Sequence, residues 1–263
     1  MPAKGAWRSD DGVPLGLADC ILCLSQAVLL RVSEAMAIID LCTRLAAPSS
    51  EDYSKPKSDA AATIFKSLVA ALTALVRQRP DILAGMMPSL TAALCQLLTL
   101  LRHAPAGYAT ALITAAHAGA APAWLDLGQA ALGPTEADLF SRLLLSMTAK
   151  TATLPAFARK QKRSGGGSDA HGLGLGTGTT SLARPFAKHA IHVLVSYCRL
   201  LNSALLVTAP EVRKALQPGL FALCDVVKTH DRDAAMASSL GPAEQVVFKD
   251  LWSRWEKQRY RGE

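Results

Sequence analysis

Apolar side chains recur every third or fourth residue through most of this chain, and prolines and glycines divide the recurrence into separate segments. This spacing puts apolar positions on one face of an α-helix. It is clearest over residues 17–45, where a polar stripe at steps of seven accompanies the apolar face. The apolar positions there are Ile21, Leu24, Val28, Val32, Ala35, Ile39 and Cys42, and the polar ones are Asp19, Gln26, Ser33 and Asp40. We therefore predict a long amphipathic helix over residues 17–45.

Prolines and capping residues delimit the other predicted helices. A second helix begins near Asp59, whose side chain can cap its first turn, and ends before Pro80. Short helical pieces follow over about residues 82–87 and 88–102. Later helices start at Thr135 as an N-cap, near Pro185, at the capping-box pair Thr208 and Glu211, and at Pro242. Pro218–Gly219 is predicted to interrupt the helix that follows Thr208, with Leu220–Lys228 continuing as a second piece.

The same periodicity predicts which side chains are buried. In the C-terminal part, one face of the helix near Pro185 carries Phe186, Ala190, Val193, Leu194, Tyr197 and Leu201, and another carries Lys188, His192, Ser196, Arg199 and Ser203. The residues predicted to join the last helices to the array are Leu216, Leu220, Phe221 and Leu223. The apolar sets are helical stripes that need a neighbouring helix to cover them, whereas the polar set can face water.

No segment shows the alternating pattern of strands, so the predicted fold class is all-α. Consecutive helix pairs of unequal length favour an irregular helical-repeat array, solenoid-like and of HEAT/armadillo type, built from antiparallel helix pairs. Residues 1–16 form a predicted flexible tail, 17–155 the N-terminal part of the array, and 182–263 its C-terminal part. Between them, residues 156–181 are basic and glycine-rich and form a predicted flexible insertion.

An uncharged stretch of 20 residues, Ile82–Leu101, has the length of a membrane span. It contains Pro88 and several polar side chains, so buried helices of an array are the preferred interpretation over a membrane hairpin. Half of the residues are hydrophobic and 19% are charged, with a net charge of +7. That excess is compatible with nucleic acid nearby without establishing it.

The sequence offers few groups for chemistry. Six cysteines in aliphatic surroundings indicate free thiols in a reducing compartment rather than a disulfide framework. Cys20 and Cys23 form an isolated CxxC within an apolar helix, which favours core packing over a zinc or redox site. His189 and His192 lack a third ligand at useful spacing, which favours ordinary surface histidines. The glycine run 172–178 has no phosphate-loop spacing. We therefore expect no enzyme activity, no cofactor, no metal and no small-molecule ligand.

Two basic features remain. Arg159, Lys160, Lys162 and Arg163 form a cluster suited to nuclear import or phosphate contact, although such clusters are often only solvated charge. At the C-terminus the basic residues Arg254, Lys257, Arg259 and Arg261 are interleaved with Trp252, Trp255 and Tyr260. These aromatic rings either stack on bases or, as their helical spacing favours, pack against the fold.

Three blocks in the last 80 or so residues carry a resemblance to a known family. They are Phe186–Leu200, Ala209–Asp225 with its Pro-Glu-Val-Arg and Pro-Gly-Leu-Phe-Ala-Leu runs, and Phe248–Trp252. Together they resemble the C-terminal domain of the nucleolar pre-ribosomal-associated protein two family, also called unhealthy ribosome biogenesis protein two. Because members are much longer, the resemblance implies that this chain corresponds to their terminal domain.

The resemblance also implies a function. It points to a non-enzymatic nucleolar factor that acts in 27S pre-rRNA processing and early large-subunit (pre-60S) assembly. The implied partners are pre-60S assembly factors, among them a companion helical scaffold and a DEAD-box helicase, and pre-rRNA-containing particles, with direct RNA contact left open and no membrane. The alternative functions are a helical adaptor in cytoplasmic or membrane-associated trafficking and, more distantly, an integral membrane protein.

Overall fold

The computed structural model describes residues 30–48, 58–105, 121–122, 124–127, 132–149, 181–203 and 206–260. Within these ranges the chain is all-α, as predicted. The helices are α2 (Val32–Ala46), α3 (Ser58–Gln78), α4 (Pro80–Leu83), α5 (Met87–Thr99), α7 (Pro134–Thr148), α8 (Ala183–Leu201), α9 (Pro210–Val226), α10 (Thr229–Ser238) and α11 (Pro242–Arg259). The predicted tail at 1–16 and nearly all of the predicted insertion at 156–181 lie outside the described residues.

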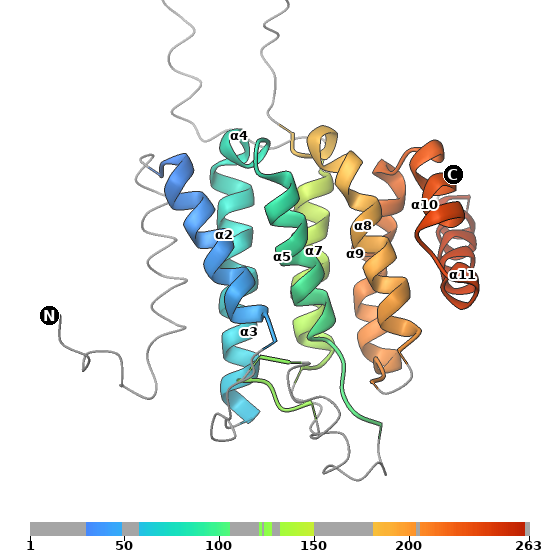
Figure 1. Ribbon diagram of the computed structural model, residues 1–263, viewed down its shortest axis with the longest axis horizontal. Coiled ribbons are helices and arrows are strands. Elements are labelled where there is room, and N and C mark those ends of the chain that lie inside the picture. Colours follow the sequence, from blue (N-terminus) through green and yellow to red (C-terminus); the bar gives the residue numbers. More distant parts are fainter. Residues whose placement is uncertain are drawn as a thin grey trace, which may run out of the picture.

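The helices form two layers (Figure 1). One layer contains α2, α5 and α8, and the other contains α3, α7 and α9, with neighbours in each layer packed against one another. Successive long helices run in opposite directions, so α2 pairs with α3, α5 lies over α7 and α8 lies over α9. The helices α10 and α11 close the C-terminal end of the array. Among the described residues the β-type pairing is a single bridge between His103 and Val207.

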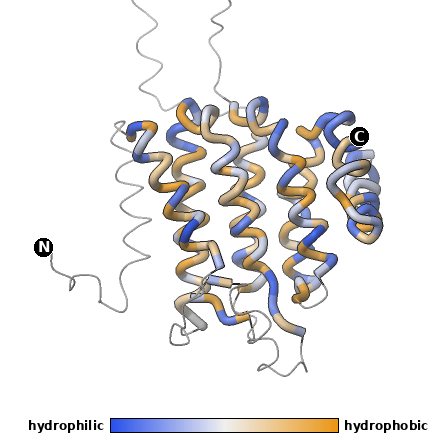
Figure 2. Tube along the Cα trace, in the orientation of Figure 1, coloured by the Kyte–Doolittle hydropathy of each residue, from blue (hydrophilic) through white to orange (hydrophobic). Residues whose placement is uncertain are grey.

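The core lies between the two layers. Its largest fully buried side chains include Phe65 on α3, Phe140 on α7 and Phe186 on α8. Figure 2 shows hydrophobic positions along all the long helices of the layers and a more hydrophilic α10–α11 end. The four residues predicted to join the last helices to the array, Leu216, Leu220, Phe221 and Leu223, are all buried. Burying each such side chain contributes about 1.5–3 kcal/mol.

The predicted helix over residues 17–45 is wrong in its continuity. Leu30 and Arg31 are not helical, and α2 begins at Val32. Arg31 has an extended backbone, and its N–H donates to Glu34 Oε2 at 2.7 Å, which caps a new helix start. Val32, predicted to be buried, is 57% exposed because it is the first residue of that helix.

Two predicted N-caps are also wrong. α7 begins at Pro134, and the N–H of its N-cap Gly133 donates to Glu136 Oε2 at 2.8 Å, so Thr135 lies inside the first turn. α9 begins at Pro210 after the N-cap Ala209, and Thr208 Oγ1 is buried with no hydrogen-bond partner among the described residues. In both helices a proline is the first helical residue, and its fixed backbone angle sets where the helix begins. The nearby threonine does not act as the N-cap in either helix.

Pro218–Gly219 does not interrupt α9, contrary to the prediction. The helix is continuous from Pro210 to Val226 with Pro218 in its interior. The reason lies on α7, where Ser141 Oγ accepts a hydrogen bond of 2.8 Å from the Gly219 N–H. A Cβ atom on Gly219 would lie 2.8 Å from the Ser141 carbonyl oxygen. Because Gly219 has no side chain, the backbones of α7 and α9 can come into contact beside Pro218.

The segment predicted as Leu220–Lys228 ends at Val226, and a separate helix that the sequence reasoning missed, α10, follows at Thr229–Ser238. Upstream, Pro80 ends α3 as predicted and itself begins α4. The short helix predicted over about 82–87 is wrong in its bounds, because α4 ends at Leu83 and residues 84–86 form a turn before α5. The uncharged stretch 82–101 otherwise consists of α5, one face of which is buried, as expected. By length and composition one helix segment in the described part, Ala60–Gln78, is apolar enough to cross a membrane, but 56% of it is buried inside this fold.

We predict that Gly219→Ala destabilises the protein although alanine is the better helix former. The added methyl group must displace the Ser141 backbone, and overpacking of this kind costs about 1–3 kcal/mol. Helix propensity returns ~1 kcal/mol, so we expect a net loss of up to about 2 kcal/mol. Urea unfolding followed by circular dichroism measures the change.

Gly85→Ala is the control, because its Cβ would lie 3.7 Å from the nearest atom, the Ile82 carbonyl oxygen. We expect its free energy of unfolding to stay within about 0.5 kcal/mol of the parent chain. Equal stability of the two variants would contradict the close α7–α9 contact.

Candidate functional site

The basic cluster Arg159, Lys160, Lys162 and Arg163 lies outside the described residues, as do Cys20, Cys23 and the glycine run. Their predicted roles, import or phosphate contact for the cluster and core packing for the two cysteines, stay predictions. The site must therefore be sought among the helices of the array.

The described cysteines are core side chains. Cys42, Cys198 and Cys224 are buried, and Cys95 is half-buried. Burial raises the pKa of the Cys42, Cys198 and Cys224 thiols to about 12 each. At neutral pH these groups are thiols rather than thiolates, so they are poor nucleophiles and poor metal ligands.

The two histidines of α8 lie on its outer side. Their ring centroids are 6.3 Å apart, with His192 exposed and His189 half-buried. Partial burial, with the charges of His192 and Lys188, lowers the pKa of His189. Over the part of the chain that the structure describes, no group of three or more His, Cys, Asp or Glu side chains gathers around a point where a metal ion would fit.

The C-terminal helices carry a row of aromatic rings along one face of α11. The Phe248 and Trp252 ring centroids are 5.8 Å apart and nearly parallel, and those of Trp252 and Trp255 are 4.9 Å apart and tilted. Phe248 is buried and the two tryptophans are half-buried. Rings in such pairs contribute about 0.5–1.5 kcal/mol beyond their buried area. The row therefore fixes the position of α11.

Charged side chains contact both tryptophans, through two cation–π interactions and one hydrogen bond. Arg232 of α10 lies 5.2 Å above the Trp252 ring, and Arg259 lies 5.5 Å from the Trp255 ring. The Trp255 Nε1–H donates to Asp225 Oδ1 at 3.0 Å, which connects α11 to the end of α9. These contacts support the packing interpretation of Trp252 and Trp255, whereas Tyr260 is 77% exposed.

The turn between α10 and α11 is fixed by backbone contacts. The Gln245 side-chain amide donates to the Met236 carbonyl at 2.9 Å and to the Leu240 carbonyl at 3.2 Å. The Gly241 N–H donates to Glu244 Oε2 at 3.0 Å and so caps α11. The two helices thus meet at a defined angle, and a hollow remains between them.

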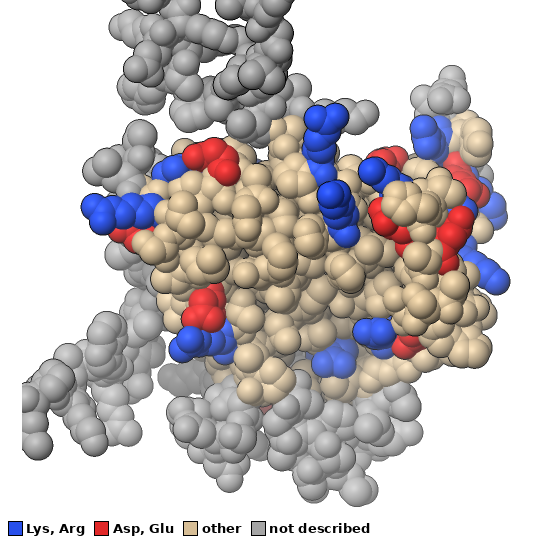
Figure 3. Space-filling model, turned by 45° about the horizontal axis from the view of Figure 1, so that its top comes forward, with Lys and Arg blue, Asp and Glu red and all other residues tan. Residues whose placement is uncertain are grey.

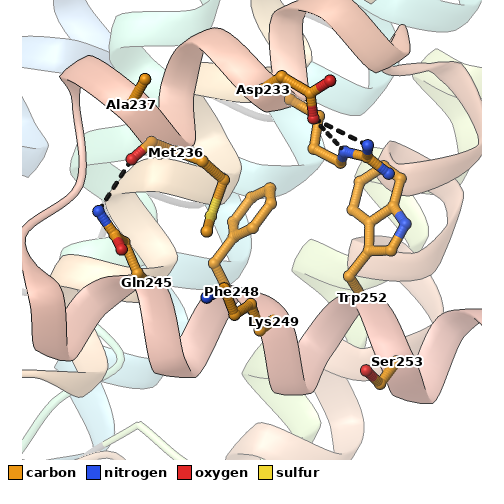
Figure 4. A pocket seen from close by; sticks show the side chains of 9 residues that line it. Asp233, Met236, Ala237, Gln245, Phe248, Lys249, Trp252 and Ser253 are labelled. Carbon is orange, nitrogen blue, oxygen red and sulfur yellow. Dashed lines mark hydrogen bonds and ion pairs between the residues drawn. The ribbon is translucent and has the colours of Figure 1, made fainter.

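That hollow, the α10–α11 groove, has a volume of about 610 Å³. Figure 4 shows Met236 of α10 and Phe248 and Trp252 of α11 projecting into the space between the two helices. Asp233 on the α10 side is paired with Arg232 at 2.8 Å. Lys249 and Ser253 of α11 also line it. An apolar floor with a few polar groups at the rim is typical of a binding groove.

Charge is distributed unevenly on the face drawn in Figure 3. Acidic and basic side chains crowd the end formed by α10 and α11, while most of the middle of the array is neither. The α10–α11 groove is thus an apolar hollow inside a charged region. Sequence reasoning found the aromatic row but missed the groove, because it missed α10. The signal available was Asp231, whose acidic side chain suits the first turn of a helix, followed by the alanine-rich run after Asp233.

The comparisons with known proteins agree with the resemblance of the C-terminal blocks. A family model, described as the Urb2/Npa2 family, matches residues 16–263. The match therefore extends from the C-terminal third over every helix that the structure describes. Searches of curated proteins and of solved structures found no match. Since the family model covers nearly the whole sequence, this chain belongs to the Urb2/Npa2 family, which is associated with ribosome biogenesis.

Proposed function

We propose that this protein is a non-enzymatic interaction scaffold of the nucleolus that acts in 27S pre-rRNA processing and early pre-60S assembly. The observation that carries the proposal is that the family match spans the array together with the aromatic α10–α11 end. The sequence resemblance supports the 27S and pre-60S assignment, and the geometry supports the scaffold role.

The two-layer arrangement suits a scaffold. The pairs α2–α3, α5–α7 and α8–α9 follow one another along the array (Figure 1), which supports a solenoid-like repeat of irregular helix pairs. In such an array each pair contacts its neighbours, and long side surfaces stay open to partners. The high thiol pKa values of Cys42, Cys198 and Cys224 support a non-enzymatic role for these residues.

The α10–α11 groove is the proposed docking site for a protein partner. Its half-buried Trp252 and Met236 are accessible anchors of the kind that dominate protein interfaces. Lys249 on the rim is exposed and forms no ion pair with any described residue. The complementary partner is a segment of a pre-60S assembly factor that places an apolar side chain on the floor and a carboxylate beside Lys249. The proposed partner set includes the companion helical scaffold and the DEAD-box helicase.

We predict that a tagged full-length chain comigrates with 27S pre-rRNA and pre-60S assembly factors. Sucrose-gradient sedimentation of nuclear extract, with rRNA probing and mass spectrometry of the fractions, is the measurement. Imaging the same tagged chain checks for nucleolar localisation. Migration only as free protein, from a chain that is expressed and nucleolar, would contradict the proposed function.

A charge reversal tests the groove. We predict that Lys249→Glu lowers the recovery of copurified pre-60S assembly factors about tenfold, because it opposes a carboxylate on the partner with a like charge. Both circular dichroism and thermal unfolding should be unchanged, since Lys249 is exposed.

Lys257→Glu is the matched control. Lys257 is exposed on the same helix and does not line the groove. It should keep full recovery of the partners. Equal losses in the two variants would show that net charge, rather than the groove, governs the association.

A further inference from the structure

A second hollow, the basic cleft, lies between α8, α9 and α11 and has a volume of about 460 Å³. The polar and charged side chains that line it are Tyr197 of α8, Arg213, Lys214 and Gln217 of α9, and Asp250 and Arg254 of α11. It is distinct from the α10–α11 groove, and the two sets of lining residues share no member. Sequence reasoning assigned no role to the charged residues of its α9 wall.

The charges in the cleft are unbalanced. Arg254 is paired with Asp250, through distances of 2.8 Å and 3.1 Å to its two carboxylate oxygens. Arg213 and Lys214 are exposed and form no ion pair or side-chain hydrogen bond with the residues that the structure describes. Two uncompensated cations therefore face a hollow whose single carboxylate is already neutralised.

Tyr197 forms part of the wall of the cleft and is 6% exposed. Burial raises its pKa to about 12, while Arg213 and Arg254 act in the lowering direction and Asp250 in the raising direction. All three of these charged side chains line the same cleft as the phenol. At neutral pH it keeps its proton and can donate a hydrogen bond into the cleft.

Donors of three kinds thus converge from three helices: guanidinium groups, an ammonium group and a phenol. The cleft lies beside Pro210, at the start of the 17-residue helix α9, whose backbone dipole adds partial positive charge at that end. A group with several exposed anionic oxygens satisfies these donors together. Phosphate presents such oxygens, and guanidinium groups bind it through paired hydrogen bonds.

We propose that the basic cleft binds the phosphodiester backbone of RNA, with Arg213 and Lys214 as the contacting cations and Tyr197 as a hydrogen-bond donor. The volume is adequate for a phosphate with its ribose, and a backbone contact needs no base recognition. RNA is preferred over an acidic peptide because the family is associated with ribosome biogenesis. The inference thus rests in part on the proposed function and adds direct RNA contact to it.

The test uses the purified full chain, a fluorescein-labelled 20-nucleotide poly-U RNA and anisotropy titrations at several salt concentrations. Arg213→Ala/Lys214→Ala is the test variant. If both side chains contact phosphates, the slope of log K against log salt concentration should fall by about 1.4 in magnitude, since each single-strand phosphate contact contributes about 0.7. Tyr197→Phe, which keeps the ring, should weaken binding and leave the slope unchanged.

The matched control is Arg184→Ala/Lys188→Ala, which removes the same charge from exposed positions of α8 outside the cleft. Its slope should stay that of the parent chain. An equal loss of slope in the control, or no loss in the test variant, would overturn the proposal. Binding of poly-glutamate at equal affinity and with the same sensitivity to Arg213→Ala/Lys214→Ala would show an acidic-peptide site and would also overturn it.

This experiment is independent of particle association. RNA binding through the cleft by a chain that does not comigrate with 27S pre-rRNA would count against the proposed function alone. Comigration of a chain whose cleft fails the titration would count against this inference alone.

Discussion

The contact between Gly219 and Ser141 is the constraint on which the rest of the array depends. It brings the backbones of α7 and α9 together at the position where Pro218 would otherwise weaken α9. The Ser141 hydroxyl then accepts a hydrogen bond from the buried Gly219 N–H. With a side chain at position 219 the two helices could not approach so closely. The layer formed by α3, α7 and α9 is thus organised around one backbone contact.

On the other side of this layer, an ion pair between described residues adds to the apolar packing of α3 against α7. Lys66 of α3 lies 3.3 Å from the buried carboxylate of Glu136, which also caps α7 by accepting the Gly133 N–H. Glu136 therefore sets both where α7 begins and how it lies against α3. α7 is packed between α3 and α9, and α8 packs against both α7 and α9. α11 in turn packs against α8 and α9. Both hollows lie at this C-terminal end, where α10 and α11 leave surface uncovered.

Local sequence signals predicted much of this fold. Helical spacing identified most of the buried face of α8 and all four residues predicted to join the last helices to the array. Pro80 and Pro242 marked real helix boundaries. What failed depends on partners far away in the sequence. The continuity of α9 across Pro218 depends on Ser141, 78 residues earlier, and no local pattern contains that information.

The candidate binding surfaces also divide into features with a local sequence signal and features that depend on residues distant in the sequence. The aromatic row at Trp252 and Trp255 follows from helical spacing, but the α10–α11 groove requires α10, which has only a weak apolar stripe. The basic cleft joins Arg213, Lys214 and Arg254 from two helices that are neighbours only in the folded chain. The basic cluster at 159–163 stood out in the sequence because its charges are adjacent, yet it lies outside the described residues. A charged cluster of neighbouring residues can be found from the sequence, whereas a cleft formed by residues of separate helices can be found only from the fold.

If the Gly219–Ser141 contact organises the array, the paired helices α7 and α9 are its most stable part. Hydrogen–deuterium exchange of the full chain, followed by mass spectrometry of peptides, tests it directly. Backbone amides that open only with global unfolding exchange last. We predict that peptides covering Phe140–Met147 and Leu216–Leu223 exchange more slowly than those covering α2 or α10. Exchange of the α7 and α9 peptides at the rate of the α10 peptide would contradict it.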